Sequence, residues 1–507
     1  MTAEPIDDPV TDERPNAFER AMILITVTMV TTLYAMTVTI ANVALPQMQG
    51  SLSATTDQIA LVVTFNIIAT AVATPMTGWL AARFSRRSIL VWGVLGFTAA
   101  SFACGLAPSL ETLILARIFQ GAFGAPLVPL SQAIVMDSYP REKQGSAMAV
   151  FGMGVVIGPV LAPTLGGYLS ELYNWRWVFF MIVPCGLAAL GGVLLYIQDR
   201  SKASSSHLDW TGFLTLSLFI ATFQFMLDRG ERLDWFESGT VLLAGTIAAL
   251  ALYLFIAHSL TADRPFLNPG LLLDRNYALG LLLVFIFGML NFTPTTLLPS
   301  LLQNVRGYPD SIIGLVLGAR GIGTLAGFTF MFWGNKLDPR PMLALGFGLQ
   351  GFSGWYMSTF SVNMTINDVF WTSALQGLGV GLIWVPLTVV TFNTLDKRHT
   401  AEATAIFHMV RNFGSSLYIS LSIALALRTA RVSYAELVTH ASPINEALVF
   451  QQGLQGSWSL ESVGALAGLS GEIGRQALMI GYLNAFFVFG LTAFAVIPVI
   501  FLVKLRR

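Results

Sequence analysis

The sequence predicts an all-α integral membrane protein with fourteen transmembrane helices, and three observations lead to this fold class. Hydrophobic residues make up 54% of the 507 residues and charged residues only 11%, whereas soluble domains are about a quarter charged. Apolar runs long enough to span a bilayer recur along the chain. Lysine and arginine are concentrated in every second segment that connects these runs. With a net charge of zero, nothing in the composition indicates a nucleic-acid partner.

The fourteen runs are each about 19 to 27 residues long, which matches the roughly 20 residues that a helix needs to cross a hydrocarbon core of about 30 Å. All connections between them are short except the last. The runs begin near Ala21, Asp57, Ser88, Leu110, Gly145, Arg176, Asp209, Glu237, Tyr277, Asp310, Pro341, Asn367, Glu402 and Leu478.

Lysine and arginine set the orientation, because short cytoplasmic loops carry the excess of these residues. With both termini inside, the inner segments hold eighteen of the 28 basic residues and the outer segments hold seven. The remaining three, Arg117, Arg320 and Arg411, lie within spans. An even number of spans and a multi-pass protein of the inner (cytoplasmic) membrane follow, with the polar segment 1–20 as a cytoplasmic tail and not a signal peptide.

Internal repetition predicts how the spans are grouped. The fourth run contains Gln120-Gly121 and the twelfth contains Gln376-Gly377, and basic loops follow both the second and the tenth run. This shift of eight spans predicts a 6+2+6 arrangement. Residues 21–197 form one six-helix bundle, 198–260 a two-helix insert, and 261–507 the second bundle, with a long periplasmic loop over 428–477.

Several motifs carry a resemblance to a known family. They are Ile40-Ala-Asn42-Val-Ala-Leu45-Pro46, the loop Gly78-Trp-Leu-Ala-Ala-Arg83-Phe-Ser-Arg86-Arg87, the run Gly154-Val-Val-Ile-Gly158-Pro159, Asn174-Trp175-Arg176-Trp177 and Arg411-Asn412-Phe-Gly414. Over nearly its full length the chain resembles the fourteen-span drug:proton antiporter branch of the major facilitator superfamily, the EmrB/QacA-type exporters.

The resemblance implies roles for two groups of residues. Gly78, Arg83, Arg86 and Arg87 correspond to the superfamily's gating loop. Gly154, Gly158 and Pro159 correspond to the antiporter signature, which shapes the interface between the halves and restrains leak. Ordinary close packing of small residues is the alternative for these glycines.

Ionisable groups inside the spans are candidates for proton coupling. A guanidinium at membrane depth costs about 2.5 to 3.5 kcal/mol, so Arg117 needs a partner or a water-filled cavity. The resemblance implies a cavity arginine that influences proton release with Glu111, and an inter-helix hydrogen bond to backbone carbonyls is the alternative. His408 and Arg411 share a helix face. Histidine changes charge near neutral pH, although a histidine hydrogen-bonded at an interface is the alternative.

The chain departs from the family pattern where carboxylates are usual. Thr37 replaces an aspartate near the end of the first span, and Ala82 and Ser85 replace residues of the gating loop. No acid lies near the middle of a predicted span, and Asp228, ahead of Glu111, is the first choice for a replacement proton carrier.

The predicted function is secondary active efflux of hydrophobic drugs or other toxic amphipathic compounds by alternating access. A proton gradient is the predicted energy source, and no cofactor is predicted. Many aromatic and methionine side chains suit a cavity for such compounds, and Asn42, Phe65, Gln120 and Trp384 are the substrate-contact candidates.

Other functions and partners stay open at this point. A dedicated exporter of a fatty acid, siderophore or antibiotic and a non-transporting sensor are the alternatives. A membrane enzyme would need clustered acids or histidines, which the sequence does not provide. In Gram-negative members of the family that the chain resembles, the exporter docks a periplasmic adaptor protein that leads to an outer-membrane channel. The resemblance implies such a partner here, with the long 428–477 loop as its docking site, and a loop that folds on itself is the alternative.

Overall fold

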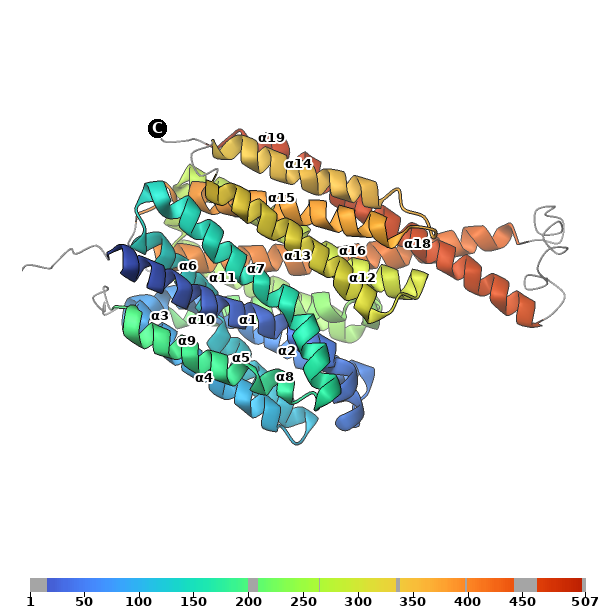
Figure 1. The fold of residues 1–507 in the computed structure, drawn as a ribbon, viewed down its shortest axis with the longest axis horizontal. Coiled ribbons are helices and arrows are strands. Elements are labelled where there is room, and N and C mark those ends of the chain that lie inside the picture. Colours follow the sequence, from blue (N-terminus) through green and yellow to red (C-terminus); the bar gives the residue numbers. More distant parts are fainter. Residues whose placement is uncertain are drawn as a thin grey trace, which may run out of the picture.

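The computed structural model describes residues 16–198, 208–263, 265–333, 338–396, 399–441 and 463–503. Every regular element in these ranges is helical. Figure 1 shows the long helices running side by side along one axis. The start of α1 and the end of α19 lie at the same end of the molecule, called here the terminal end, and the opposite end is the distal end.

The first group of helices ends before residue 197. α1 packs against α7 and α9, α2 against α5, and α4 against α5 and α9. The bounds are α1 (Ala17–Ser51), α2 (Thr56–Ala73), α3 (Met76–Phe84), α4 (Arg86–Leu106), α5 (Leu110–Gly124), α6 (Leu127–Ser138), α7 (Arg141–Leu172), α8 (Trp177–Phe180) and α9 (Ile182–Tyr196).

The second group begins after residue 268. α13 packs against α15, α12 against α16, and α14 against α15 and α18. The bounds are η3 (Pro269–Leu273), α12 (Arg275–Arg306), α13 (Asp310–Trp333), α14 (Pro339–Met357), α15 (Ile366–Phe392), α16 (Thr400–Thr439), α18 (Val463–Ala495) and α19 (Ile497–Ile500).

Caps and prolines explain where these helices begin and break. Asn16, Thr55, Ser109 and Thr365 each form a capping box, in which the cap side chain and the side chain three residues later satisfy backbone N–H groups at the helix start. Pro75 separates α2 from α3, which are bent by 55° relative to each other, because proline cannot donate the helical hydrogen bond.

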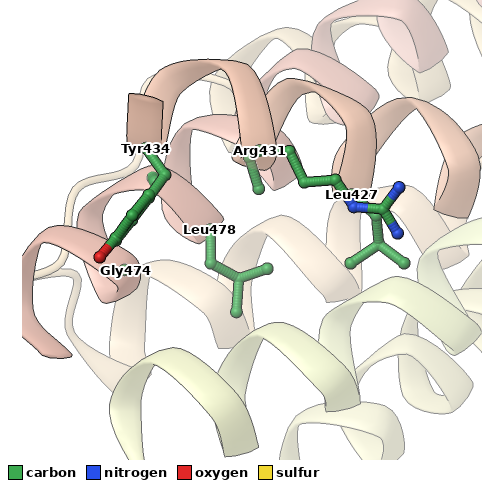
Figure 2. A pocket seen from close by; sticks show the side chains of 7 residues that line it. Leu427, Arg431, Tyr434, Gly474 and Leu478 are labelled. Carbon is green, nitrogen blue, oxygen red and sulfur yellow. The ribbon is translucent and has the colours of Figure 1, made fainter. Parts of the chain in front are cut away.

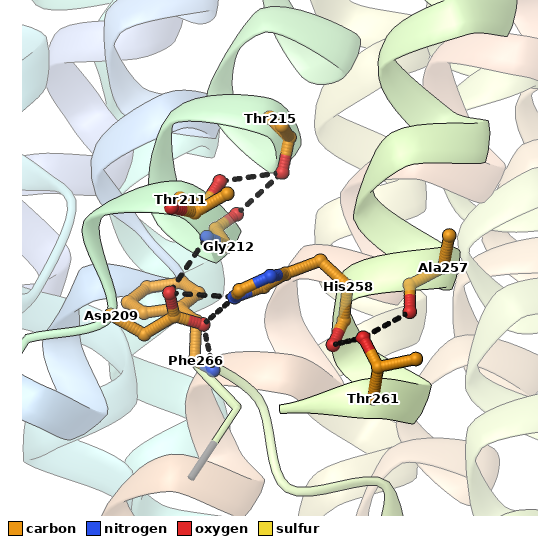
Figure 3. A network of polar contacts seen from close by, with 8 residues as sticks. All are labelled: Asp209, Thr211, Gly212, Thr215, Ala257, His258, Thr261 and Phe266. Carbon is orange, nitrogen blue, oxygen red and sulfur yellow. Dashed lines mark hydrogen bonds and ion pairs between the residues drawn. The ribbon is translucent and has the colours of Figure 1, made fainter. Parts of the chain in front are cut away.

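Between the two groups lie α10 (Trp210–Arg229), η1 (Glu231–Leu233), η2 (Trp235–Glu237) and α11 (Gly239–Thr261). α10 packs against α11, α2 and α16, so it bridges both groups. Figure 3 shows how this pair of helices is tied together. The Asp209 carboxylate accepts hydrogen bonds from Gly212 N–H (3.0 Å), His258 Nε2 (2.8 Å) and Phe266 N–H (2.9 Å).

Each of the fourteen predicted runs coincides with a helix or a broken helix. Among the described residues, twelve helices are long and apolar enough to cross a membrane, and thirteen are when α2 and α3 count as one span. α14, the run predicted from Pro341, does not reach that apolarity because it begins with Pro-Arg-Pro and contains Gln350. The count of fourteen therefore stays a prediction.

The long loop predicted over 428–477 is shorter in the structure. α16 continues to Thr439 and α18 starts at Val463, and the residues 442–462 lie outside the described ranges. Side chains farther along join the two helices, since the Tyr434 hydroxyl is 2.9 Å from Ser470 Oγ. Figure 1 shows this α16–α18 hairpin projecting past the other helices at the distal end.

Candidate functional site

The contact surface between the two helix groups, called here the seam, is closed at the terminal end. Gly78 of α3 lies against Glu402 of α16 so closely that a Cβ atom on Gly78 would be 2.8 Å from the Glu402 Cα. The Glu402 carboxylate in turn accepts a hydrogen bond from Asn268 N–H (2.9 Å). Only glycine permits this approach, so Gly78 of the predicted gating loop has a definite packing role in this conformation.

α7 and α13 form the second part of the seam. The Ser146 hydroxyl donates to Phe332 O at 3.2 Å, and a Cβ atom on Gly152 would be 2.5 Å from the Phe328 ring. Farther from the terminal end, Gly321 packs against Val160. One and two turns beyond Gly321, no described atom lies within 4 Å of the Cβ positions of Gly318 and Gly314. In the part of the seam that the structure describes, α7 and α13 are thus packed up to Gly321, and two glycine positions beyond it face open space.

His408 lies inside this seam and connects the two groups directly. Its Nε2 is 2.6 Å from Gln132 Oε1 of α6. Both side chains are buried, with 2% of His408 and none of Gln132 exposed. The second ring nitrogen, Nδ1, and the Gln132 amide nitrogen have no hydrogen-bond partner among the described residues. Nothing in the sequence marks Gln132 as the partner of His408.

Trp384 and Arg411 lie beside His408. The indole ring of Trp384 contacts the rings of Phe287, Phe407 and His408, and the Arg411 guanidinium carbon is 5.5 Å from its centre, at cation–π distance. Arg411 also donates to Asn412 Oδ1 at 3.0 Å and is half-buried. Trp384, one of the predicted substrate contacts, is itself only 7% exposed, so in this conformation it lies inside an aromatic and cationic cluster at the seam.

Arg117 is buried within the first helix group, and one of its contacts is the inter-helix hydrogen bond to a backbone carbonyl that the packing alternative predicts. Its guanidinium donates to Gln120 Oε1 (2.5 Å) and to Val62 O (3.3 Å), while Gln120 donates to Ser101 Oγ (2.7 Å). Glu111 is exposed at the start of α5, and none of these contacts involves it. Gln120 is fully buried and engaged at both ends of its amide, so it is closed to a ligand in this conformation.

Arg320 repeats this arrangement in the second group. It donates to Gln376 Oε1 (2.5 Å) and Asn291 Oδ1 (2.7 Å), and Gln376 exchanges hydrogen bonds with Gln350 of α14. Gln120 and Gln376, the residues of the sequence repeat, thus both bind an arginine and a neighbouring helix. Neutral amides and carbonyls stabilise both guanidinium groups.

Asp228 lies near the end of α10, where this helix bridges the two groups. Its carboxylate accepts a hydrogen bond from the Thr64 hydroxyl of α2 at 2.5 Å, and Arg229 is 3.9 Å away. The adjacent Leu227 O accepts from Ser420 of α16 at 2.8 Å. The Asp228 side chain is 36% exposed, so it is both accessible and in contact with the first helix group.

The other predicted gating residues have separate contacts. Arg86 forms an ion pair with Asp137, Arg87 donates to Leu194 O (2.8 Å), and Arg83 is exposed. Gly154 and Gly158 lie against α1, because the Thr32 hydroxyl donates to Gly154 O (2.7 Å) and a Cβ on Gly158 would be 2.5 Å from Thr32 O.

These contacts show how the α7 glycines pack in this conformation, while their role at the interface between the halves stays a prediction. Gly154 and Gly158 hold α7 within its own group, whereas Gly152 and Val160 make the contacts across the seam. Pro159, between them, is half-buried, as is Phe65 on α2. Asn42 belongs to α1, but its side chain lies outside what the structure describes.

The distal hairpin carries a groove of about 400 Å³ between α16 and α18. Figure 2 shows Leu427, Arg431 and Tyr434 on one helix facing Gly474 and Leu478 on the other. The Tyr434 hydroxyl is 2.9 Å from Ser470 Oγ, and Arg431 lies 3.4 Å from Glu231 of η1. The groove therefore lies at the base of the hairpin, where Leu478 packs against the second helix group and Arg431 contacts η1.

Comparisons with known proteins agree with the helical membrane fold. The sequence profile of the Major Facilitator Superfamily matches residues 27–419. The multidrug export protein EmrB of Escherichia coli (strain K12) is 33% identical over 410 residues, 80% of each chain. The fatty acid resistance protein FarB of Neisseria gonorrhoeae is 32% identical over 476 residues, 92% of each chain. The crystal structure of the human organic anion transporter MFSD10 aligns with a TM-score of 0.60 at 11% identity, covering 94% of this chain and 99% of that one.

Proposed function

The chain belongs to the major facilitator superfamily, and we propose on that premise that it is a secondary active transporter that exports hydrophobic drugs or other toxic amphipathic compounds. Relatives named for multidrug export favour this function over a dedicated metabolite exporter or a non-transporting sensor. Transport and not an enzymatic reaction is the activity.

One observation carries the mechanism. Among the described residues, the seam is packed from Gly78 and Ser146 up to Gly321, and the Cβ positions of Gly318 and Gly314 beyond it face open space. A seam closed at one end and open at the other is what alternating access requires of each end state. With both termini in the cytoplasm of an inner-membrane protein, this conformation faces outward, the state that releases an exported compound.

Inward proton flow drives this export in our proposal. Arg117, Asp228, Glu111, His408 and Arg411 are the coupling candidates, and Asp228 comes first. Its carboxylate is accessible and touches α2, while its own helix is held to α16. Gain or loss of a proton at Asp228 therefore changes a contact that bridges both moving parts.

The test compares Asp228→Asn with the wild-type protein in proteoliposomes. We expect export driven by a pH gradient to be lost and binding of a hydrophobic drug to be kept. The reason is that the amide oxygen still accepts the hydrogen bond from Thr64, but the amide cannot gain or lose a proton. Asp234→Asn, at an exposed position in the following turn, is the matched control. Export by Asp228→Asn at the wild-type rate removes this residue from the mechanism.

The substrate site in this proposal lies at the parted side of the seam, near Trp384 and Phe65, with Asn42 contributing from α1. Trp384 is buried beside the Arg411 guanidinium in this conformation, and its ring becomes a contact for a ligand with apolar rings when the helices around it move apart. Gly78, Arg83, Arg86 and Arg87 act at the terminal-end gate, supported by the contact between Gly78 and Glu402.

A periplasmic adaptor leading to an outer-membrane channel is the proposed partner, and the distal hairpin is its docking site. The hairpin projects past the other helices and carries an apolar groove. Removing residues 440–470 is expected to abolish adaptor pull-down while leaving drug binding intact. Unchanged pull-down after this deletion contradicts docking at the hairpin.

A further inference from the structure

The bond between His408 and Gln132 is the one place in the described seam where a titratable ring itself joins the two helix groups. α16 contributes His408 and α6 contributes Gln132, and the 2.6 Å contact lies on the closed side of the seam. Toward the distal side, the next turn of α16 brings Arg411, which is half-buried. The ring therefore lies about one turn below the part of the seam that solvent reaches.

Counting hydrogen-bond donors shows which charge state of His408 the closed seam accommodates. A neutral imidazole has one donor and one acceptor, so it satisfies the single contact with the Gln132 amide in either amide orientation. An imidazolium has N–H donors on both nitrogens. Nδ1 is buried and has no acceptor among the described residues. Protonation in place would bury an unsatisfied charged donor.

The charged groups around the ring do not compensate for this. Arg411 lies one turn along α16 and repels an imidazolium. Glu402 is six residues earlier on α16 and is engaged by Asn268. The Tyr277 hydroxyl of α12 donates to Ala403 O, and Asp137, at the end of α6, pairs with Arg86. α15 presents the uncharged Trp384, and Tyr34 of α1 is the remaining titratable neighbour, acting on Arg411.

We propose that the His408–Gln132 bond is a proton-sensitive latch that holds the terminal-end seam closed while His408 is neutral and releases it when His408 is protonated. His408 binds a proton more tightly when the terminal end of the seam is open, because both ring N–H groups can then be hydrated. Protonation therefore shifts the population toward the state that is open at the terminal end. Gln132 acts as the positioning residue for His408.

The direction of this shift fits proton-driven export, and in that respect the inference rests on the proposed function. A proton that enters from the distal side and binds His408 opens the terminal end. The proton is released there, the ring becomes neutral and the latch re-forms. Each opening of the terminal end thus carries one proton inward.

The experiment measures opening of the terminal end directly, without substrate. Spin labels are placed at Lys143→Cys on α7 and Trp333→Cys on α13, both exposed terminal-end positions, in full-length protein with Cys104 and Cys185 replaced. Distance distributions are recorded in lipid nanodiscs at pH 8.5 and pH 5.5. The wild-type latch is expected to give a short distance at pH 8.5 and an added longer population at pH 5.5.

Two variants and a control test the assignment. His408→Asn keeps a hydrogen-bonding amide but cannot be protonated, so the distance stays short at both pH values. Gln132→Glu places a carboxylate opposite the imidazolium, so the seam stays closed at pH 5.5 through an ion pair. His440→Asn, at the far end of the distal hairpin, keeps the wild-type response.

The proposal is overturned when His408→Asn opens at pH 5.5 like the wild type, or when the wild type shows no change between the two pH values. Export measured separately in proteoliposomes distinguishes the two levels. Export without a pH-dependent distance removes the latch and leaves the proposed function intact. A pH-dependent distance in a protein that exports nothing supports the latch and contradicts the proposed function.

Discussion

At the scale of single residues, the two buried arginines are stabilised by neutral groups rather than by carboxylates. Arg117 and Arg320 each bind a glutamine, Gln120 or Gln376, and a backbone carbonyl. Amide oxygens are suitable partners because they satisfy guanidinium donors without burying a second charge. Arg117 therefore stabilises the first helix group, and its burial separates it from the exposed Glu111.

Replacing Arg117 tests this structural role. Arg117→Met leaves the buried Gln120 Oε1 without its donor, at a cost of about 1 to 3 kcal/mol for an unsatisfied buried group, while Val62 O keeps the intrahelical hydrogen bond of α2. We expect a lower unfolding temperature for the detergent-solubilised protein, followed by tryptophan fluorescence. Arg83→Met, at an exposed position, serves as control. A variant at Arg117 that melts with the wild type argues against the role.

At the scale of helices, close packing at glycines decides which helices move together. Gly154 and Gly158 let α7 approach α1 within one helix group, while Gly152 and Gly321 let α7 and α13 meet across the seam. Small residues provide such approaches in membranes, where packing replaces the hydrophobic effect between helices. α7 thus belongs to the first group, and the contact that can change is the one between α7 and α13.

Gly158→Ala is expected to destabilise the protein. The new Cβ atom would be 2.5 Å from Thr32 O, a backbone atom that cannot move without shifting α1, and overpacking of this kind costs about 1 to 3 kcal/mol. Gly191→Ala on α9, where the Cβ meets nothing within 4 Å, is the matched control. Comparing the two melting temperatures decides the matter, and equal values contradict the α1–α7 contact.

The insert α10–α11 contains a contact whose strength depends on pH. Burial disfavours the Asp209 carboxylate, but hydrogen bonds from Gly212 N–H, His258 and Phe266 N–H outweigh this effect and lower the pKa of Asp209 below its ordinary value. A carboxyl group with a lowered pKa stabilises the fold above the pKa of the unfolded chain, about 3.9. This stabilisation is lost as the pH falls through the folded-state pKa.

Asp209→Asn should therefore melt at a lower temperature than the wild type at pH 7, and the difference should shrink as the pH falls below about 4. The reason is that the wild-type carboxylate becomes protonated in that range and loses the advantage over an amide. Melting curves of both proteins at pH 7 and pH 3.5 provide the measurement. A difference that stays constant over this range contradicts the role of the ionised carboxylate.

At the scale of the whole molecule, two helix groups meet along a seam that is closed at the terminal end, with α10 crossing between them. α2 and α16 both pack on α10, and Asp228 and Ser420 attach it to each side. Because α10 contacts both helix groups, we expect its contacts to change when one group moves relative to the other. This placement explains why a carboxylate on the insert is the first candidate for proton coupling.

The orientation of the molecule in the membrane has a direct test. With Cys104 and Cys185 replaced, Ser53→Cys in the turn between α1 and α2 should react with a membrane-impermeant maleimide in intact cells. Lys143→Cys at the start of α7 should react only in inverted vesicles, because it lies at the predicted cytoplasmic end. Labelling of both positions from the same side would contradict the arrangement of the spans.

The sequence by itself determined the membrane-spanning helical fold, since long apolar runs and the alternation of lysine and arginine depend only on local composition. It also singled out Arg117, Gly78 and His408, because an ionisable group or a glycine motif inside an apolar run is visible without a partner. Only the tertiary structure decided what these residues contact. Gln132, Thr64 and Gly152 are ordinary in their local sequence, and their importance comes from side chains more than a hundred residues away. A contact across the seam is a property of two helices brought together, and neither helix carries it in its own sequence pattern.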